Sequence, residues 1–190
     1  DAGNQMDILG QSTLLRYREL LGEDIKMPED IYAGEYVKEI AQDLYQEYGS
    51  DLMEKEEAER LEICREYAYQ EMLKNIEADL EKFGIEFDSW FSERTLHPDK
   101  IQHAIDLLRD KGYIFEEEDA LWFKSTDFGD DKDRVIIKSD GSPTYMAADM
   151  AYHLDKLERG FDKLINVWGA DHHGYIPRMK AVIEAFGYEQ

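Results

Sequence analysis

The residues best suited to chemistry are one carboxylate and two imidazoles near the end of the chain. Asp171, His172 and His173 follow an apolar run at 164–168 and a turn at Gly169, and a predicted helix comes after them. Polar groups between a strand and a helix lie at the carboxyl edge of a sheet, where open α/β folds bind ligands. Contact with a nucleotide or a substrate is therefore one interpretation of this turn.

Two other interpretations of the turn stay open. Asp171 could cap the helix predicted at about 174–186, with both histidines facing water. A metal site is conceivable because Asp and His are common ligands. However, the histidines are adjacent and no HxH or HxxxH spacing supports them, which argues against a metal. The residue types alone do not decide between capping and ligand contact.

A second candidate site lies on the helix predicted after Pro143. Tyr145 and Asp149 are four residues apart, so they share one face of that helix. A carboxylate can pair with a guanidinium in a bidentate geometry, and an aromatic ring beside it supplies a stacking wall. The alternative is a half-buried Tyr and an Asp that faces water near the amino end of the helix, where the helix dipole favours it.

Other polar residues carry weaker local signals. Glu93 directly follows a segment at 85–91 that alternates like a strand, and it could simply be a helix-entry residue. Asp1, Asn4 and Gln5 open the first predicted helix, where capping is the simplest role for most of them.

Three separated stretches resemble the catalytic domain of bacterial-type arginyl-tRNA synthetases, which are class I aminoacyl-tRNA synthetases. They are DAGNQM at the amino end, DGSPTYMAADMAYHLDKLERGFDKLINV, and WGADHHGYIPRMKA, in the family's order. The resemblance covers nearly the whole chain and is strongest at 87–188 and 1–21. The His-Ile-Gly-His and Lys-Met-Ser-Lys-Ser signatures of the class are absent. The resemblance therefore implies a piece from the middle of the enzyme that is catalytically inert by itself.

The resemblance also implies roles for the candidate residues. Those expected to contact the substrate arginine are Tyr145, Asp149, Asp171 and Glu93, the last near the α-ammonium group. Those expected at the ATP and adenosine site are Gly169, His172 and His173, while Asn4 and Gln5 lie at the edge of the active-site sheet. ATP with Mg²⁺ is the expected cosubstrate, and no tightly bound cofactor or metal is expected. L-arginine and tRNA(Arg) are the expected partners of the full-length enzyme.

Composition limits what this chain does alone. Its 190 residues carry 22 basic and 44 acidic side chains, for a net charge of −22. Because nucleic-acid binding depends on Lys and Arg, we expect the segment by itself to repel tRNA. The single Cys64 in a helical pattern indicates a small core or boundary residue in a reducing compartment. The sequence shows no signal peptide or membrane-spanning run, so the cytoplasm is expected.

Hydrophobic periodicity predicts a helix at the amino end, stopped by Gly22, and a helical tract from 36 to 83 interrupted near Gly49. Further helices are predicted over 97–111, after Pro143, and over 174–186. Strands are predicted at 113–117 and 120–125, as a hairpin, and at 87–91, 135–138 and 164–168 in a mostly parallel sheet.

The expected fold class is α/β, a partial Rossmann-like nucleotide-binding catalytic domain with a helical insertion. Residues 1–22 are assigned to the edge of the catalytic domain, 23–83 to the insertion, and 84–190 to a Rossmann-like core segment that carries a β-hairpin. Two further functions remain possible: a class I synthetase for another amino acid, and an acidic helical module that binds a protein or senses arginine without catalysis.

Overall fold

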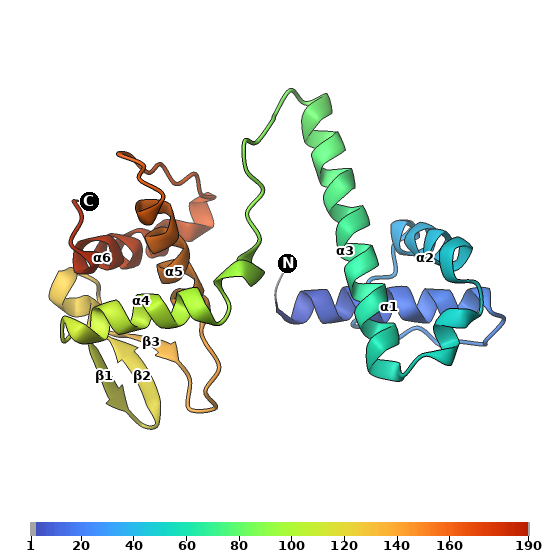
Figure 1. The fold of residues 1–190 in the computed structure, drawn as a ribbon, viewed down its shortest axis with the longest axis horizontal. Coiled ribbons are helices and arrows are strands. Elements are labelled where there is room, and N and C mark those ends of the chain that lie inside the picture. The colour runs from blue at the N-terminus through green and yellow to red at the C-terminus, as the bar shows by residue number, and fades with distance from the viewer. Residues whose placement is uncertain (1–2, 190) are drawn as a thin grey trace. The chain divides into compact units, whose positions relative to one another are not determined.

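The computed structural model describes residues 3–189 and divides the chain into two compact units, Asp1–Phe91 and Ser92–Gln190 (Figure 1). Asp1, a candidate cap in the sequence, lies outside the described residues.

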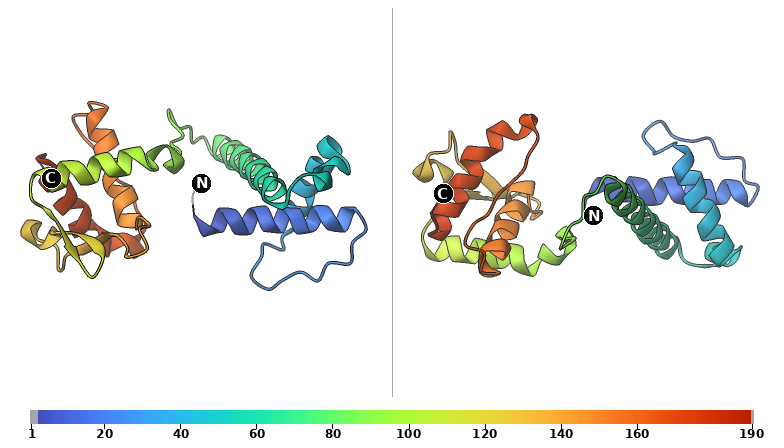
Figure 2. Two further views of the ribbon diagram at one scale, coloured as in Figure 1. Left: turned by 60° about the horizontal axis from the view of Figure 1, so that its bottom comes forward. Right: turned by 90° about the horizontal axis from the view of Figure 1, so that it is seen from above.

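Helices form the described part of the first unit. These are α1 (Asn4–Leu20), α2 (Glu35–Tyr48), the short 3-10 helix η1 (Asp51–Glu54) and α3 (Glu57–Lys82). Helix α1 packs against both α2 and α3, and its crossing with α3 can be followed in both views of Figure 2. The helices predicted from hydrophobic periodicity are therefore confirmed in this unit.

The core of the first unit is centred on Tyr17 of α1. It joins Tyr17 to Ala41, Leu44, Leu52 and Cys64, all fully buried. The Tyr17 hydroxyl donates a hydrogen bond to the carbonyl of Gly49, at the end of α2. Burial raises the pKa of the Tyr17 phenol and of the Cys64 thiol to about 12 each, so both stay protonated at neutral pH. Cys64 is thus a small core residue, as its helical pattern indicates.

The second unit combines helices with a small sheet. The helical elements are η2 (Glu93–Leu96), α4 (Asp99–Asp110), η3 (Ser125–Phe128), α5 (Tyr145–Glu158), η4 (Ala170–Tyr175) and α6 (Ile176–Phe186). The strands are β1 (Ile114–Glu117), β2 (Ala120–Phe123) and β3 (Arg134–Ile137), in the order β1-β2-β3. Helix α5 packs against α4, α6 and β3, so it occupies the middle of the unit.

The predicted hairpin is confirmed. Strand β1 pairs antiparallel with β2, and the two residues between them, Glu118 and Asp119, have positive φ of 51° and 59°. Two consecutive residues with positive φ match the twist of a two-residue hairpin turn. Strand β3 adds to the other side of β2, with a register shift between Leu121 and Trp122.

The mostly parallel sheet predicted from the sequence is wrong for these residues. The predicted strand at 135–138 exists as β3, but it pairs antiparallel with β2. The segments 87–91 and 164–168 are extended and form no ladder with another described segment. A strand takes its backbone hydrogen bonds from a neighbour, so an apolar run without a neighbour stays irregular and exposed. Val167, for example, is 91% exposed.

None of the helices described between residues 3 and 189 is both long and apolar enough to cross a bilayer.

Candidate functional site

One face of α5 carries the predicted pair of Tyr145 and Asp149. Tyr145 is the first residue of the helix and is 78% exposed, whereas Asp149, one turn further, is half-buried. The same face continues with Tyr152 and Lys156, and the Lys156 ammonium lies 3.9 Å from the centre of the Tyr152 ring. The predicted pair therefore lies on a single helix face, with an exposed ring above a shielded carboxylate.

The start of α5 is held by the sheet rather than by a side-chain cap. Thr144 occupies the N-cap position, but its hydroxyl lies 2.9 Å from the Val135 carbonyl oxygen of β3 and donates to it. This hydrogen bond attaches the first turn of α5 to β3. It thereby fixes the positions of Tyr145 and Asp149 relative to the sheet.

Asp149 lies in an unusual electrostatic environment. Burial raises the pKa of its carboxyl group, and the negative charge of Glu93 raises it further. A hydrogen bond from Tyr175 and the charges of His153 and Lys156 oppose this rise. No ion pair to Asp149 is formed within the described part of the chain. A half-buried carboxylate that forms no ion pair is a place where a cationic ligand would be stabilised.

Glu93 approaches Asp149 from another element. It begins η2, is half-buried, and its carboxylate lies 3.7 Å from Nε2 of His97. The charge of Glu93 raises the pKa of Asp149, and the family resemblance predicts a contact with arginine for both carboxylates.

His153 connects the Asp149 backbone to the interior of the unit. It is 4% exposed, and its Nδ1 lies 2.8 Å from the Asp149 carbonyl oxygen. Burial lowers the pKa of the imidazole, so the neutral ring donates from Nδ1 to that carbonyl. Nε2 is buried and forms no hydrogen bond with normal geometry to the described residues, although Asn166 is close enough to affect the imidazole pKa.

The turn with the two histidines forms η4, and all three polar residues in it are exposed. The carboxylate of Asp171 lies 3.1 Å from Nδ1 of His172, which lowers the pKa of that carboxyl group. Tyr175, and not Asp171, occupies the N-cap position of α6. The capping interpretation of Asp171 is therefore wrong. Between residues 3 and 189, no group of three or more His, Cys, Asp or Glu side chains is arranged to hold a metal ion.

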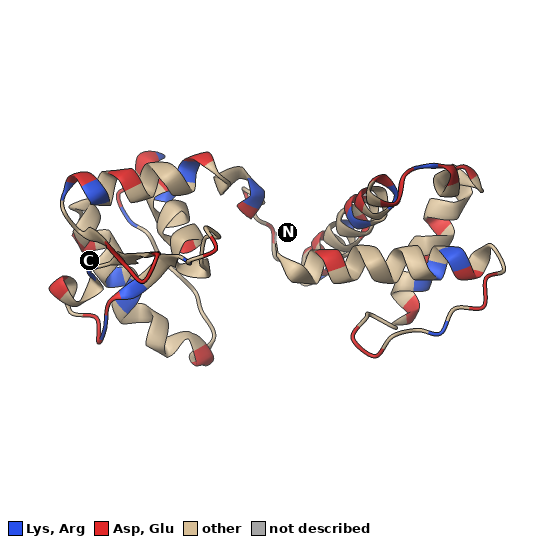
Figure 3. Cartoon of the chain, turned by 90° about the horizontal axis from the view of Figure 1, so that it is seen from below, with Lys and Arg blue, Asp and Glu red and all other residues tan. Residues whose placement is uncertain are grey.

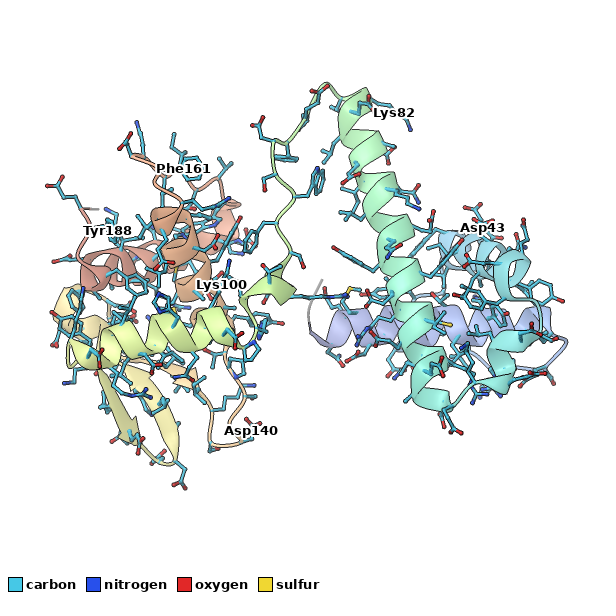
Figure 4. The ribbon with its side chains drawn as sticks, in the orientation of Figure 1. Asp43, Lys82, Lys100, Asp140, Phe161 and Tyr188 are labelled. Carbon is cyan, nitrogen blue, oxygen red and sulfur yellow. The ribbon has the colours of Figure 1, made fainter. Side chains whose placement is uncertain are left out.

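A cavity of about 1200 Å³ opens beside η4. It lies between the end of α5, the extended segment 161–169, η4 and α6, and Phe161 and Tyr188, both labelled in Figure 4, are among its lining residues. Three predicted nucleotide-site residues, Gly169, His172 and His173, line it, and Asp171 does not. The structure therefore gathers the three around one hollow, separate from the carboxylates on α5 and η2.

Asn4 and Gln5 belong to the first unit. They form the first turn of α1 and are exposed, and the N-cap residue Gly3 has no side-chain cap. Gln5 lines a smaller cavity of about 530 Å³ with Met6, Leu9 and three tyrosines. Neither residue has a side-chain capping bond in the described structure.

Sequence reasoning missed Tyr175. This half-buried residue ends η4, and its ring packs edge-on against Trp168 and His172, with centroid distances of 6.3 Å in both cases. The Arg178 guanidinium lies 4.9 Å from the ring centre. One indication of a role for Tyr175 was present in the sequence, namely that it lies in the same short turn as Asp171. A phenol gives no spacing pattern of its own, and its contact with α5 is tertiary.

Comparison with known proteins identifies the family. A family model described as "tRNA synthetases class I (R), catalytic domain" matches residues 20–190. The arginine–tRNA ligases of Bacillus licheniformis and Bacillus subtilis are 57% and 56% identical over 191 residues, which is 100% of this chain and 34% of each relative. The chain thus spans about a third of the length of the curated relatives it matches.

Solved structures agree with this result. A crystal structure from Campylobacter jejuni, named for an arginyl-tRNA synthetase, is 43% identical with a TM-score of 0.91, over 100% of this chain and 41% of that chain. Arginyl-tRNA synthetase from Plasmodium falciparum is 15% identical with a TM-score of 0.66, over 99% of this chain and 32% of that chain, which shows a shared fold alone.

These comparisons confirm the expected α/β fold class and the resemblance to arginyl-tRNA synthetases. The helices with a small antiparallel sheet match the catalytic domain of a solved class I relative, although the parallel strands expected within this segment are not formed. The chain therefore belongs to the class I (R) tRNA synthetase family and forms part of its catalytic domain.

Proposed function

We propose that this chain supplies the arginine-recognition pocket of an arginine–tRNA ligase, with Asp149 as the residue that pairs with the substrate guanidinium. The observation that carries the proposal is the half-buried Asp149 carboxylate, which forms no ion pair within the described residues and has a raised pKa. An arriving cation would compensate the cost of keeping this group ionised. A guanidinium does so with two parallel hydrogen bonds.

A second carboxylate, that of Glu93, is available for the second positively charged group of free arginine, its α-ammonium. Glu93 is close enough to raise the pKa of Asp149 by repulsion. In our proposal Glu93 takes the α-ammonium group, and the exposed ring of Tyr145 forms a wall of the pocket above Asp149. Asp171 completes the arginine site from η4. Two converging carboxylates favour a ligand with two positive charges over one with a single positive charge.

The adenosine side of the reaction is assigned to the neighbouring cavity. In this proposal Gly169, His172 and His173, which line it, contact ATP or the adenylate. The reaction joins the arginine carboxylate to the α-phosphate of ATP with release of pyrophosphate. The arginyl group then passes from this adenylate to a hydroxyl of the terminal adenosine of tRNA, and AMP is released. Mg²⁺ bound to the phosphates supplies charge stabilisation, and the protein mainly positions the reactants.

The remaining parts of the proposal concern the longer protein. The residues that handle the phosphates belong to the two signatures this sequence lacks, so these 190 residues alone are inert. The net charge of −22 leaves tRNA(Arg) binding to other parts of the polypeptide, and acidic side chains are spread over both units (Figure 3). Residues 23–83 act as a helical insertion, and Asn4 and Gln5 lie at the edge of the active site. We also propose a cytoplasmic location, which the similarity to bacterial arginine–tRNA ligases supports.

An arginine titration of this chain followed by amide NMR tests the proposal. L-citrulline, a neutral analogue with nearly the same shape, is the control ligand. We expect arginine to shift resonances near residues 93, 145–153 and 169–175, and citrulline to shift them much less. The Asp149→Asn variant should lose the arginine response, whereas Glu158→Gln, which alters an exposed carboxylate on the same helix, should keep it. Equal responses to both ligands, or an unchanged response in Asp149→Asn, would sink the proposal.

A further inference from the structure

Three exposed aromatic side chains line the cavity beside η4. They are Phe161, Trp168 and Tyr188, and the aliphatic side chains of Leu157 and Ile183 line the same cavity. Apolar rings that stay in contact with water lose the free energy that burial would give them. When several such rings gather around one hollow, the hollow is suited to a flat, largely apolar ligand.

Trp168 is held in place by aromatic contacts before any ligand arrives. Tyr175 packs against it with ring centroids 6.3 Å apart and an interplanar angle of 83°. Tyr175 is itself in contact with the His172 ring, at a centroid distance of 6.3 Å, and with the Arg178 guanidinium, 4.9 Å from its ring centre. These contacts prefer defined geometries. A ring has two faces and one edge-on partner covers at most one of them, so Trp168 keeps indole surface available to the cavity that it lines.

The charges around the cavity are compatible with a nucleotide. Among the described lining residues, the charged side chains are two lysines and two carboxylates, namely Lys163, Lys180, Asp162 and Glu189. Their formal charges cancel, although the whole chain carries −22. An anionic ligand is therefore repelled less by this lining than by a surface with the average charge of the chain. His172 and His173 of η4 add ring N–H groups that can donate hydrogen bonds to a nucleotide.

We propose that Trp168 is a binding residue for the adenine base of the nucleotide, with the base stacked on the indole surface that borders the cavity. This inference rests on the proposed assignment of the cavity to ATP and the adenylate. Stacking on an aromatic side chain is tolerant of base identity because every base has a π-face. Trp168 therefore supplies affinity for a nucleobase, and guanosine should stack on it about as well as adenosine.

Tryptophan fluorescence of this chain tests the stacking. The chain has three tryptophans, so Trp90→Phe combined with Trp122→Phe leaves Trp168 as the single emitter. Adenosine and guanosine should quench its emission to saturation, and ribose should leave it unchanged. The complementary variant Trp168→Phe, which keeps Trp90 and Trp122, should show no saturable quenching.

Amide NMR in the same adenosine titration separates failure of the stacking from failure of the cavity assignment. If adenosine shifts the resonances of residues 169–173 and leaves Trp168 emission unchanged, the stacking is refuted while adenosine still occupies the cavity. If adenosine shifts no resonance between residues 153 and 189, both the stacking and the assignment of this cavity to adenosine are wrong.

Binding constants for adenosine, measured by the same NMR titration, give a second test. Trp168→Leu should weaken binding about tenfold or more, because base–aromatic stacking is lost. Trp168→Phe keeps an aromatic ring and should retain most of the affinity. Trp90→Leu, at an exposed tryptophan of the first unit, is the matched control and should bind like wild type. Wild-type affinity in Trp168→Leu, or equal losses in the Leu and Phe variants, would overturn the inference.

Discussion

At the residue scale, the ionised Asp149 carboxylate lowers the stability of the fold, and in our proposal it also binds the arginine guanidinium. Its carboxylate is half-buried, and the first cause of its raised pKa is burial. The Asp149 carboxyl group therefore binds its proton more tightly in the folded protein than in the unfolded chain. Above the raised pKa the ionised group therefore destabilises the fold, and this cost disappears as pH falls below the ordinary value of 3.8.

Asp149→Asn should consequently stabilise this chain at neutral pH. The amide keeps the shape and an oxygen acceptor for Tyr175, and it carries no charge to desolvate. We expect the Tm at pH 7 to rise by roughly a few degrees, and the difference from wild type to shrink near pH 4. Thermal unfolding followed by circular dichroism measures both. A variant that is less stable than wild type at pH 7 would contradict this electrostatic explanation.

The candidate site could be predicted from the sequence only where its geometry is local. The four-residue spacing of Tyr145 and Asp149 places them on one helix face in any α-helix, and the structure has that helix. Convergence of Glu93 on Asp149 was implied by the family resemblance alone. The charge of Asp149 on α5 raises the pKa of Tyr175 in η4, and no spacing rule reports an interaction that tertiary packing creates.

At the element scale, helices and the hairpin were predictable because their hydrogen bonds lie close in sequence. Helix α4, with Ile101, Ala104, Ile105 and Leu108 buried, follows its apolar periodicity directly. The segments 87–91 and 164–168 have strand-like sequences but lack a hydrogen-bonded partner among the described residues. A strand depends on its neighbour, so local pattern alone could not settle them.

Gly10 sets the close approach of α1 and α3. A Cβ built at this position would lie 2.8 Å from the Cβ and 3.1 Å from the Cα of Arg65, and the second of these atoms is backbone. Gly10→Ala should therefore destabilise the first unit by about 1–3 kcal/mol, despite the better helix propensity of alanine. Urea unfolding measures the change. Gln11→Ala, exposed on the same helix, is the control and should be nearly neutral; equal stability of the two variants would show that the crossing can relax.

The buried pair of Asp130 and Arg134 holds η3 and β3 together, and η3 in turn packs on α6. Nε and Nη2 of Arg134 lie 2.7 and 2.8 Å from the two carboxylate oxygens, and the Asp130 side chain is 1% exposed. Burial alone would raise the Asp130 pKa, but the bonds from Arg134 hold it well below its usual range. The pair's contribution to stability is therefore present above the ordinary Asp pKa and is lost as pH falls through the lowered one.

Arg134→Met should destabilise this chain by about 3–5 kcal/mol at pH 7, because it leaves a buried carboxylate without its cation. The double variant Arg134→Met with Asp130→Asn removes that charge and should recover part of the loss. Chemical unfolding of the three proteins gives the comparison. If the double variant is as unstable as the single one, the loss comes from packing and not from the uncompensated charge.

At the scale of the whole molecule, the chain is a strongly acidic part of a longer catalytic domain. It spans about a third of its curated relatives and carries neither class I signature. In our proposal, the second unit carries the residues that select arginine, and the residues that handle the phosphates of ATP belong to the two signatures that this sequence lacks.

These 190 residues alone should show no arginine-dependent exchange of pyrophosphate into ATP. A chimeric enzyme, in which this chain replaces the matching third of the Bacillus subtilis arginine–tRNA ligase, should show it. The reason is that positioning and charge stabilisation of the phosphates come from the absent signatures. Exchange of labelled pyrophosphate is the measurement. Activity of the isolated chain above a no-enzyme blank would contradict the division of labour.

The measurement that tests the central claim most directly is the arginine dependence of the chimeric enzyme with Asp149→Ala. We expect kcat/KM for arginine to fall by about two to three orders of magnitude, equivalent to about 3–4 kcal/mol, because the bound guanidinium loses the carboxylate proposed to pair with it. KM for ATP should stay near wild type. Arginine kinetics close to those of the unmodified chimera would show that Asp149 does not bind the guanidinium.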